Sequence, residues 1–273
     1  MSATSGIQFS VGLRYASLFA LNAAGRPAGT SASSGAAYSG LQIEGAKSYT
    51  LTTPEPRIIN HTGDDRLLAK DTLPPLEGIT GELKVSKNRY DVRALLTGVL
   101  ENTVGEATTL TFSTDKQGYE PQVGLMLFQQ SLDANTAGSL FGKRRWRSSW
   151  IPKAIAIPLQ PNMDENSSEL TFKINAFVIR NHLWGTAFSA LTDGCTEAQG
   201  IEMMTEGKPW LDAWVGDGST TVFTLTKTAY AVGKISVFKN GVLLSVGVTP
   251  TLTDVTITPA PLLGDDIDIL YEW

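Results

Sequence analysis

Few side chains in this sequence have the type and spacing that catalysis requires. The 273 residues include two histidines, His61 and His182, and a single cysteine, Cys195. His61 lies in the turn-like stretch NHTGDD and His182 lies beside an apolar stretch, so each is expected to sit at the surface or at a strand end. Cys195 has no second cysteine with which to form a zinc site, a redox pair or an internal disulfide. A nucleophilic pair of Cys195 and His182 stays open, but no motif supports it.

The sequence also lacks the short motifs that mark common enzyme classes. It contains no GxSxG, HExxH, GxxxxGK[ST] or GxGxxG motif. Adjacent acids occur at Asp64-Asp65, Asp164-Glu165 and Asp265-Asp266. Neighbouring residues on a strand point to opposite faces, and acids are common at turns, so nothing nominates these pairs for glycoside hydrolysis. We therefore expect a protein that is not an enzyme and that uses no cofactor or metal.

Composition predicts a globular chain with a real core. Hydrophobic residues make up 42% of the sequence and charged residues 18%, with a formal net charge of −5. This excludes the class of unstructured, highly charged chains. No stretch approaches the length of a membrane span, and the first residues lack the pattern of a signal peptide. We expect a soluble protein that folds in a reducing cytosol without contact to a membrane.

Alternating apolar and polar residues predict strands over most of the chain. The candidates are 7–13, 45–52, 56–60, 82–86, 107–114, 154–159 and 169–179. Gly63-Asp64-Asp65 predicts a turn that joins Ile58-Ile59 to Leu67-Leu68 in a hairpin. Residues 123–132 are apolar without a clear period, and they fit a buried strand or a helix equally well.

One helix is expected among these strands. It begins near Tyr90, with Asp91 at its electropositive N-terminal end. Apolar residues recur at the spacing of one helical face, which predicts a buried stripe of Val92, Leu95, Leu96, Val99 and Leu100.

The pattern changes near residue 210, which suggests a domain of residues 1–210 followed by a small all-β domain of residues 211–273. The second part holds four short strand candidates, and Asn240-Gly241 is the strongest hairpin signal in the chain. It carries three basic and seven acidic residues, so its net charge is −4. The acidity of the protein is thus concentrated in this C-terminal part.

Three motifs of the C-terminal part resemble a small β module of bacteriophage virion proteins. They are the opening G-D-G-S-T-T-x-F-T-L, the hairpin x-V-x-x-N-G-V-L and the closing T-I-T-P-A-P-x-x-G-D-x-I-x-I-x-Y. Such modules occur at the ends of tail, fibre and decoration proteins. The resemblance therefore implies a virion surface without indicating which component.

The larger part resembles the major tail tube protein of long, non-contractile phage tails. Residues 76–100 look like the strand and helix of that fold, residues 148–177 look like its late hairpin, and residues 54–76 look like the excursion that contacts the next ring. The resemblance implies a mainly β fold, a β-sandwich or β-barrel with one flanking helix. It also implies rings of subunits, usually six, whose strands pair into a barrel around a channel that DNA passes through.

Two groups of residues are candidates for contacts in such an assembly. Thr171, Lys173 and Asn175 alternate with apolar residues and are expected to face the channel, although an ordinary half-buried sheet has the same pattern. The second group is a basic run, for which ion pairing between subunits, a solvated loop and nucleic-acid contact all stay open. This run consists of Lys143, Arg144, Arg145, Trp146 and Arg147.

The functional expectation is a structural subunit of the virion tail, made in the host cytoplasm, that assembles with itself and with other tail proteins. A nearly neutral channel suits DNA that passes without specific binding. The alternative is another virion component, such as a capsid decoration protein or a binding protein associated with the fibre or baseplate. Residues 23–40, which are small and polar, are expected to be a surface loop or an arm that orders against a neighbouring subunit.

Overall fold

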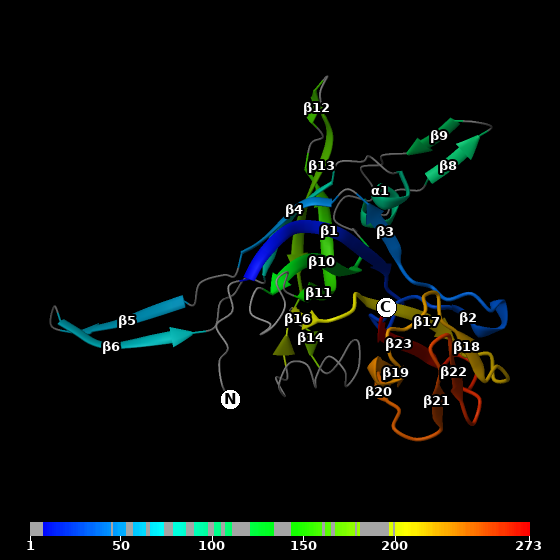
Figure 1. Ribbon diagram of the computed structural model, residues 1–273. Helices are drawn as coiled ribbons and strands as arrows, with labels where there is room; N and C mark the ends of the chain where they lie inside the picture. Colours follow the sequence, from blue (N-terminus) through cyan, green and yellow to red (C-terminus); the bar gives the residue numbers. More distant parts are fainter. Residues whose placement is uncertain are drawn as a thin grey trace.

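The structure of the protein is a computed structural model, and it is mainly β (Figure 1). It describes residues 8–44, 46–52, 57–63, 66–73, 79–85, 90–97, 101–104, 107–110, 121–133, 143–159, 162–164, 167–177, 179–180, 197–198 and 200–273. The mainly β fold class expected from the sequence is confirmed. Within the described ranges, no helix combines the length and the hydropathy that a transmembrane span needs.

The N-terminal part of the chain builds an antiparallel sheet with the strand order β3-β1-β10-β11-β13-β7-β4. Two further strands attach to it, β12 to β13 and β16 to β11. The strands are β1 (Gln8–Ala20), β3 (Leu41–Glu44), β4 (Ala46–Thr52), β7 (Thr80–Val85), β10 (Val123–Asp133), β11 (Lys143–Pro158), β12 (Asn162–Asp164), β13 (Ser167–Ala176) and β16 (Ile201–Thr205).

This sheet curves back on itself. Its two terminal strands, β3 and β4, are separated in sequence by Gly45 alone, so the ends of the sheet have to meet, and β4 approaches β1. One cluster of apolar side chains from these strands fills the enclosed space, including Leu18, Leu83 and Phe172. We refer to this part as the barrel.

Helix α1 (Tyr90–Thr97) packs against β11 and contributes to the same core. Val92 and Leu96 are fully buried, and Leu95 packs at the margin of the core. The helix is shorter than the stripe expected from the sequence, because Glu101 already belongs to strand β8 (Glu101–Val104). Val99 and Leu100 lie outside the described residues.

Strand β11 has different partners along its length within this one sheet. Its second half, from Ala154 to Pro158, pairs with β13 in the barrel. Its first half pairs with β16 on one side and with β10 on the other, and β10 pairs in turn with β1. We call this four-stranded sheet, in the order β1-β10-β11-β16, the wing.

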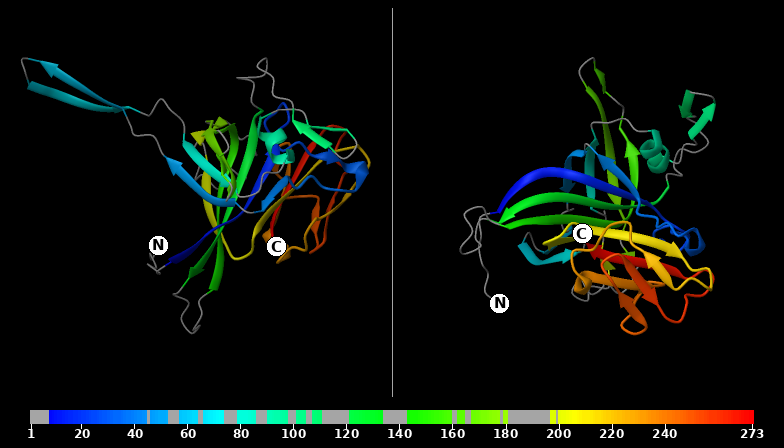
Figure 2. Two further views of the ribbon diagram at one scale, coloured as in Figure 1. Left: turned by 90° about the horizontal axis from the view of Figure 1, so that it is seen from above. Right: turned by 45° about the vertical axis from the view of Figure 1, so that its right-hand side comes forward.

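Two hairpins project from the body of the molecule. The longer hairpin consists of β5 (Arg57–Gly63) and β6 (Arg66–Leu73), and the shorter one of β8 and β9 (Ala107–Leu110). Each forms a sheet of its own two strands, and Figures 1 and 2 show both extending away from the barrel. The hairpin expected around Gly63 is thereby confirmed. A smaller pair joins β14 (Ile179–Arg180) to β15 (Glu197–Ala198).

The C-terminal residues form two small sheets around a core of their own, which we call the module. The larger sheet has the order β2-β17-β23-β19-β20 and the smaller one the order β18-β22-β21. The strands are β2 (Thr30–Ser31), β17 (Pro209–Val215), β18 (Val222–Thr224), β19 (Ile235–Lys239), β20 (Val242–Leu243), β21 (Val248–Pro250), β22 (Asp254–Ile257) and β23 (Asp266–Glu272). The hairpin at Asn240-Gly241 is confirmed, and both residues have the positive φ that this turn needs.

A segment far upstream completes the module. Residues 22–39, which we call the arm, run beside β17, where β2 pairs in parallel and the amides and carbonyls of Tyr38 and Ala213 bond to each other. The sequence suggested a surface loop or an arm that orders on a neighbouring subunit. In the structure the arm docks on its own chain, because β17 at the border of the module sheet offers it unpaired backbone groups.

A third apolar cluster joins the module to the barrel. Leu211 of β17 packs with Phe19 of β1, Phe128 of β10 and Trp150 of β11, and all four are at least 97% buried. One face of the wing is therefore covered by the module.

Candidate assembly surface and joint between the two parts

The wing ends in two strand edges that no described strand occupies. On β1, strand β3 covers only Tyr15–Leu18, so the edge of residues 8–14 is open. On the opposite side, β16 pairs with β11 and with no other described strand. Unpaired N–H and C=O groups along such edges are a template for another strand.

The two faces of the wing differ in chemistry. Trp146 and Trp150 of β11 face the module, together with Phe128 of β10. Arg145 and Arg147 alternate with these tryptophans and therefore lie on the opposite face. The face away from the module is polar around Arg145 and Arg147, whereas at Leu125 and Leu127 of β10 the same face lines the barrel core.

The basic run forms the first residues of β11, so of the three alternatives left open by the sequence the structure does not support the solvated loop. Pairing with β10 begins at Lys143 and Arg144, whose side chains lie outside the description. The run forms a strand because its backbone pairs with β10. The charges of the run give no sign of this pairing in the sequence. Alternation then places Trp146 on the face opposite to Arg145 and Arg147.

Thr171, Lys173 and Asn175 occupy the polar face of β13. Phe172 and Ile174 between them are buried, which confirms the alternation. Both edges of β13 are occupied, by β11 and by β7 of the same chain. A neighbouring copy therefore cannot add a strand to β13. The open edges of β1 and β16 in the wing offer the unpaired backbone groups that such an addition needs.

Lys208, just before β17, places its ammonium group among aromatic rings of both parts. Only 5% of the residue is exposed. Its Nζ lies 3.9 Å from the ring centroid of Tyr15, and further rings surround it at 5.2 to 6.0 Å, from Phe128, Trp146, Trp210 and Trp273. Burial, followed by repulsion from Lys227, lowers the pKa of Lys208 to about 8, while the ring faces favour the charged form.

Asp212 connects the arm to both long strands of the module. The residue is fully buried and accepts hydrogen bonds from Ser39 Oγ at 2.6 Å and from Trp210 Nε1 at 3.0 Å. Its second oxygen accepts from the Tyr271 hydroxyl at 2.9 Å and from the backbone N–H of Thr226 at 2.8 Å. Burial and the neighbouring Asp212 charge raise the pKa of Tyr271, so the phenol stays a donor.

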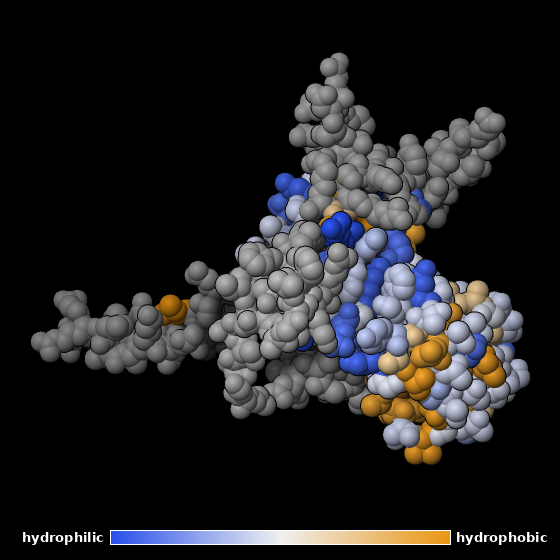
Figure 3. Space-filling model, in the orientation of Figure 1, coloured by the Kyte–Doolittle hydropathy of each residue, from blue (hydrophilic) through white to orange (hydrophobic). Residues whose placement is uncertain are grey.

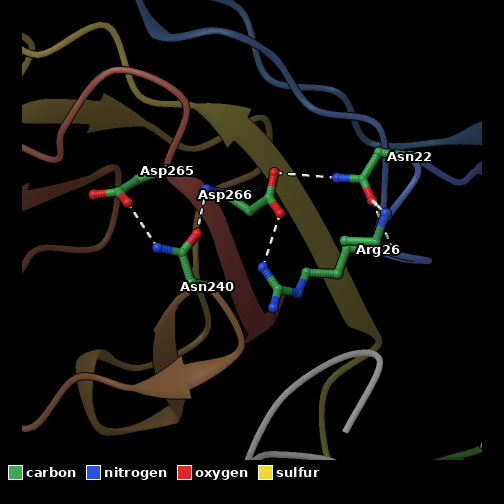
Figure 4. A network of polar contacts seen from close by, with 6 residues as sticks. Asn22, Arg26, Asn240, Asp265 and Asp266 are labelled. Atoms are coloured by element: carbon green, nitrogen blue, oxygen red, sulfur yellow. Dashed lines mark hydrogen bonds and ion pairs between the residues drawn. The ribbon is translucent and has the colours of Figure 1, made fainter.

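A second polar network holds the beginning of the arm, as Figure 4 shows. Asp266 of β23 accepts from Arg26 Nη1 at 2.8 Å and from Asn22 Nδ2 at 3.1 Å. On the other side, Asn240 Oδ1 accepts from the backbone N–H of Asp266 at 2.9 Å, and its amide donates to Asp265. This network ties the arm to β23 and to the β19–β20 turn.

Sequence reasoning missed the cage around Lys208 and both acid networks. The signal was the stretch DDIDILYEW, in which Asp266 and Asp268 share one face of a strand while the isoleucines share the other. Such a polar face normally meets water, and the sequence does not show that a segment 240 residues away covers it.

The remaining candidates for chemistry are not brought together. His61 lies in β5 of the projecting hairpin, and His182 and Cys195 lie outside the described residues. Within the part of the chain that the structure describes, no group of three His, Cys, Asp or Glu side chains is placed to hold a metal ion. No protein-family model matches this sequence, and no curated protein matches it.

Proposed function

We propose that the protein is a structural subunit that assembles into rings through its wing, as the tail tube subunit of a phage with a long, non-contractile tail. The observation that carries this proposal is the pair of open edges on β1 and β16. The resemblance of residues 76–100 and 148–177 to tail tube proteins supplies the identity of the assembly.

The strand directions of the wing permit ring closure. Every neighbouring pair in the order β1-β10-β11-β16 is antiparallel, so β1 and β16 run in opposite directions. A β16 edge of one copy therefore lies antiparallel to a β1 edge of the next copy. This contact is heterologous, and such contacts close into a ring when the rotation between copies fits.

The covered face of the wing indicates which side points to the channel. The module packs on the face with Trp146 and Trp150, and Leu125 and Leu127 on the other face line the barrel core, so only the part of that face around Arg145 and Arg147 is available to line a channel. Both arginines already interact with other groups of the chain.

The hairpin β5–β6 supports contact between stacked rings. An isolated two-stranded hairpin is marginal in water, and this one makes a sheet with no other described strand. Ile58 on β5 is 54% exposed. A neighbouring copy would supply the surface that this hairpin lacks.

Cysteine cross-linking tests the edge pairing. In a Cys195→Ser background, one cysteine is placed within 9–11 of β1 and one within 202–204 of β16, over all registers. Within one copy, these strands are three spacings apart, about 14 Å, which exceeds the reach of a disulfide. We expect covalent multimers in one register and rings by negative-stain microscopy.

The matched control moves the second cysteine to β13, as Thr171→Cys, whose strand has both edges occupied. This pair should stay monomeric on a denaturing gel. Monomers in every β1–β16 register, together with a monomeric protein in solution, would refute the proposed assembly.

A second candidate is a virion surface protein that binds another protein. Apolar side chains gather on the visible face of the module (Figure 3), and Val246, Leu262 and Leu263 are 70% to 85% exposed. Exposed apolar groups of this kind mark interaction sites. A monomeric protein in the cross-linking experiment would favour this candidate.

A further inference from the structure

The module contains a buried carboxyl group that the proposed assembly does not use. Asp268 lies in the middle of β23 and is 4% exposed. Asp268 lies on the same face of β23 as Leu270, which packs against the apolar cluster that joins the module to the barrel. Its side chain therefore points away from the core of the module. Neither carboxyl oxygen has a hydrogen-bond partner among the described residues.

The charged group that faces Asp268 from outside its own strand comes from the arm. Arg26 donates through Nη1 to Asp266, and its Nε is buried without a hydrogen-bond partner among the described residues. Beside Asp268, β17 contributes Ala213 and β19 contributes Phe238, and neither side chain is charged. Two acids of β23 thus share one arginine.

This arrangement favours a neutral carboxyl group. An ionised carboxylate that is buried without hydrogen bonds is strongly disfavoured. Burial raises the pKa of Asp268 to about 7, and repulsion from Asp266 acts in the same direction, while Arg26 acts against both. The pKa of an Asp in water is about 4, so any opening that hydrates Asp268 lowers it.

We propose that Asp268 is a proton-controlled latch between the arm and the module. While the carboxyl group is protonated, it is neutral and the arm stays docked on β17 and β23. When it ionises, its O–H bond breaks, the proton passes to water, and the carboxylate gains free energy by becoming hydrated. The arm binds the neighbouring Asp266 on the same face of β23 through Arg26 and Asn22, so lifting of the arm admits water to Asp268.

The direction of the pH effect follows from the two states. The open state ionises near pH 4 and the closed state near pH 7, so opening becomes more favourable as the pH rises through this window and levels off above it. Between pH 5 and pH 8, the opening equilibrium should increase about tenfold or more.

Hydrogen exchange of the full-length chain measures this opening. The amides of Tyr38 and Ala213, which bond to each other's carbonyls, report on arm docking after correction for intrinsic exchange. In the unaltered protein we expect the opening equilibrium constant to rise about tenfold or more between pH 5 and pH 8. In Asp268→Asn, which keeps the shape and cannot ionise, we expect no pH dependence in this range.

Two further variants make the result specific. Asp254→Asn changes a half-buried carboxyl group of β22 in the same module, whose pKa is lowered by hydrogen bonds from Thr224 and Thr253, and should keep the normal pH dependence. Arg26→Met removes the cation that favours ionised Asp268, so the transition should move to higher pH. A flat profile in the unaltered protein, or the same profile in Asp268→Asn, would overturn the proposal.

Discussion

The ammonium nitrogen of Lys208 lies 3.9 Å from the centre of the Tyr15 ring. Tyr15 belongs to β1 of the barrel, and Lys208 leads into β17 of the module, where its backbone bonds in both directions with Trp273. A cation at this distance from a ring face is attracted by the ring, and more strongly when water is excluded. The contact therefore helps to fix the two parts of the molecule to each other.

Replacing Lys208 should weaken the joint. We expect Lys208→Ala to lower the free energy of unfolding by about 2–3 kcal/mol, since it removes both the buried aliphatic stem and the cation. Lys208→Met keeps most of the packing and should cost about 1 kcal/mol. Urea denaturation at pH 7 measures both. An unchanged free energy of unfolding in Lys208→Met would show that the charge contributes nothing.

The buried stripe of α1 should be essential for the barrel. Leu96 is fully buried in the core, so Leu96→Ala should cost about 2–5 kcal/mol. Leu96→Asp should prevent folding, because it places an unpaired charge there. Ala94→Ser, at a half-buried position of the same helix, is the control and should stay folded by circular dichroism. A soluble, cooperatively unfolding Leu96→Asp protein would contradict this burial.

Removal of residues 211–273 should damage the barrel as well. A module that only decorated the outside of a tube would be dispensable for assembly. Because Leu211 and Leu270 cover Phe128 and Trp150, the truncated chain would expose a large apolar face. We expect it to aggregate, measured as loss of soluble protein in size-exclusion chromatography. A soluble truncated chain that still forms rings would disprove the covering role.

The turn at Asn240-Gly241 offers a test with a matched control. Gly241 has a φ of +78°, which disfavours any side chain, so Gly241→Ala should cost about 1–2 kcal/mol. Gly233 has open space around its Cβ position and no positive φ. Gly233→Ala should therefore be neutral or stabilise by up to about 1 kcal/mol. Thermal unfolding of the two variants compares them, and equal midpoints would argue against strain at Gly241.

Local patterns predicted the elements whose signals lie within a few residues. The alternation around Phe172 and the turn residues at Gly63 and Gly241 act over short distances, and the structure bears them out. Residues 123–132 gave no period because β10 is buried on both faces. Leu125 and Leu127 face the barrel core, whereas Met126 and Phe128 face the cluster under the module.

Contacts between segments that are far apart in the sequence could not be predicted from local patterns. The polar composition of residues 28–40 indicates a loop, but nothing in it shows that Thr30 pairs with Trp214 or that Ser39 donates to Asp212. The cage around Lys208 likewise depends on rings from separate strands. The open edges of the wing, on which the assembly proposal depends, are properties of the strand order and not of any single stretch.

The bond between Asn22 and Asp266 spans 244 positions of the chain. During synthesis, the arm therefore leaves the ribosome long before β23, to which it docks, has been made. Contacts of such long range slow folding, and β1, which precedes the arm, exposes an unpaired edge in the meantime. A chain that lacks β23 would leave both the arm and the apolar face of the wing without their partners, so such a copy would not reach the native state.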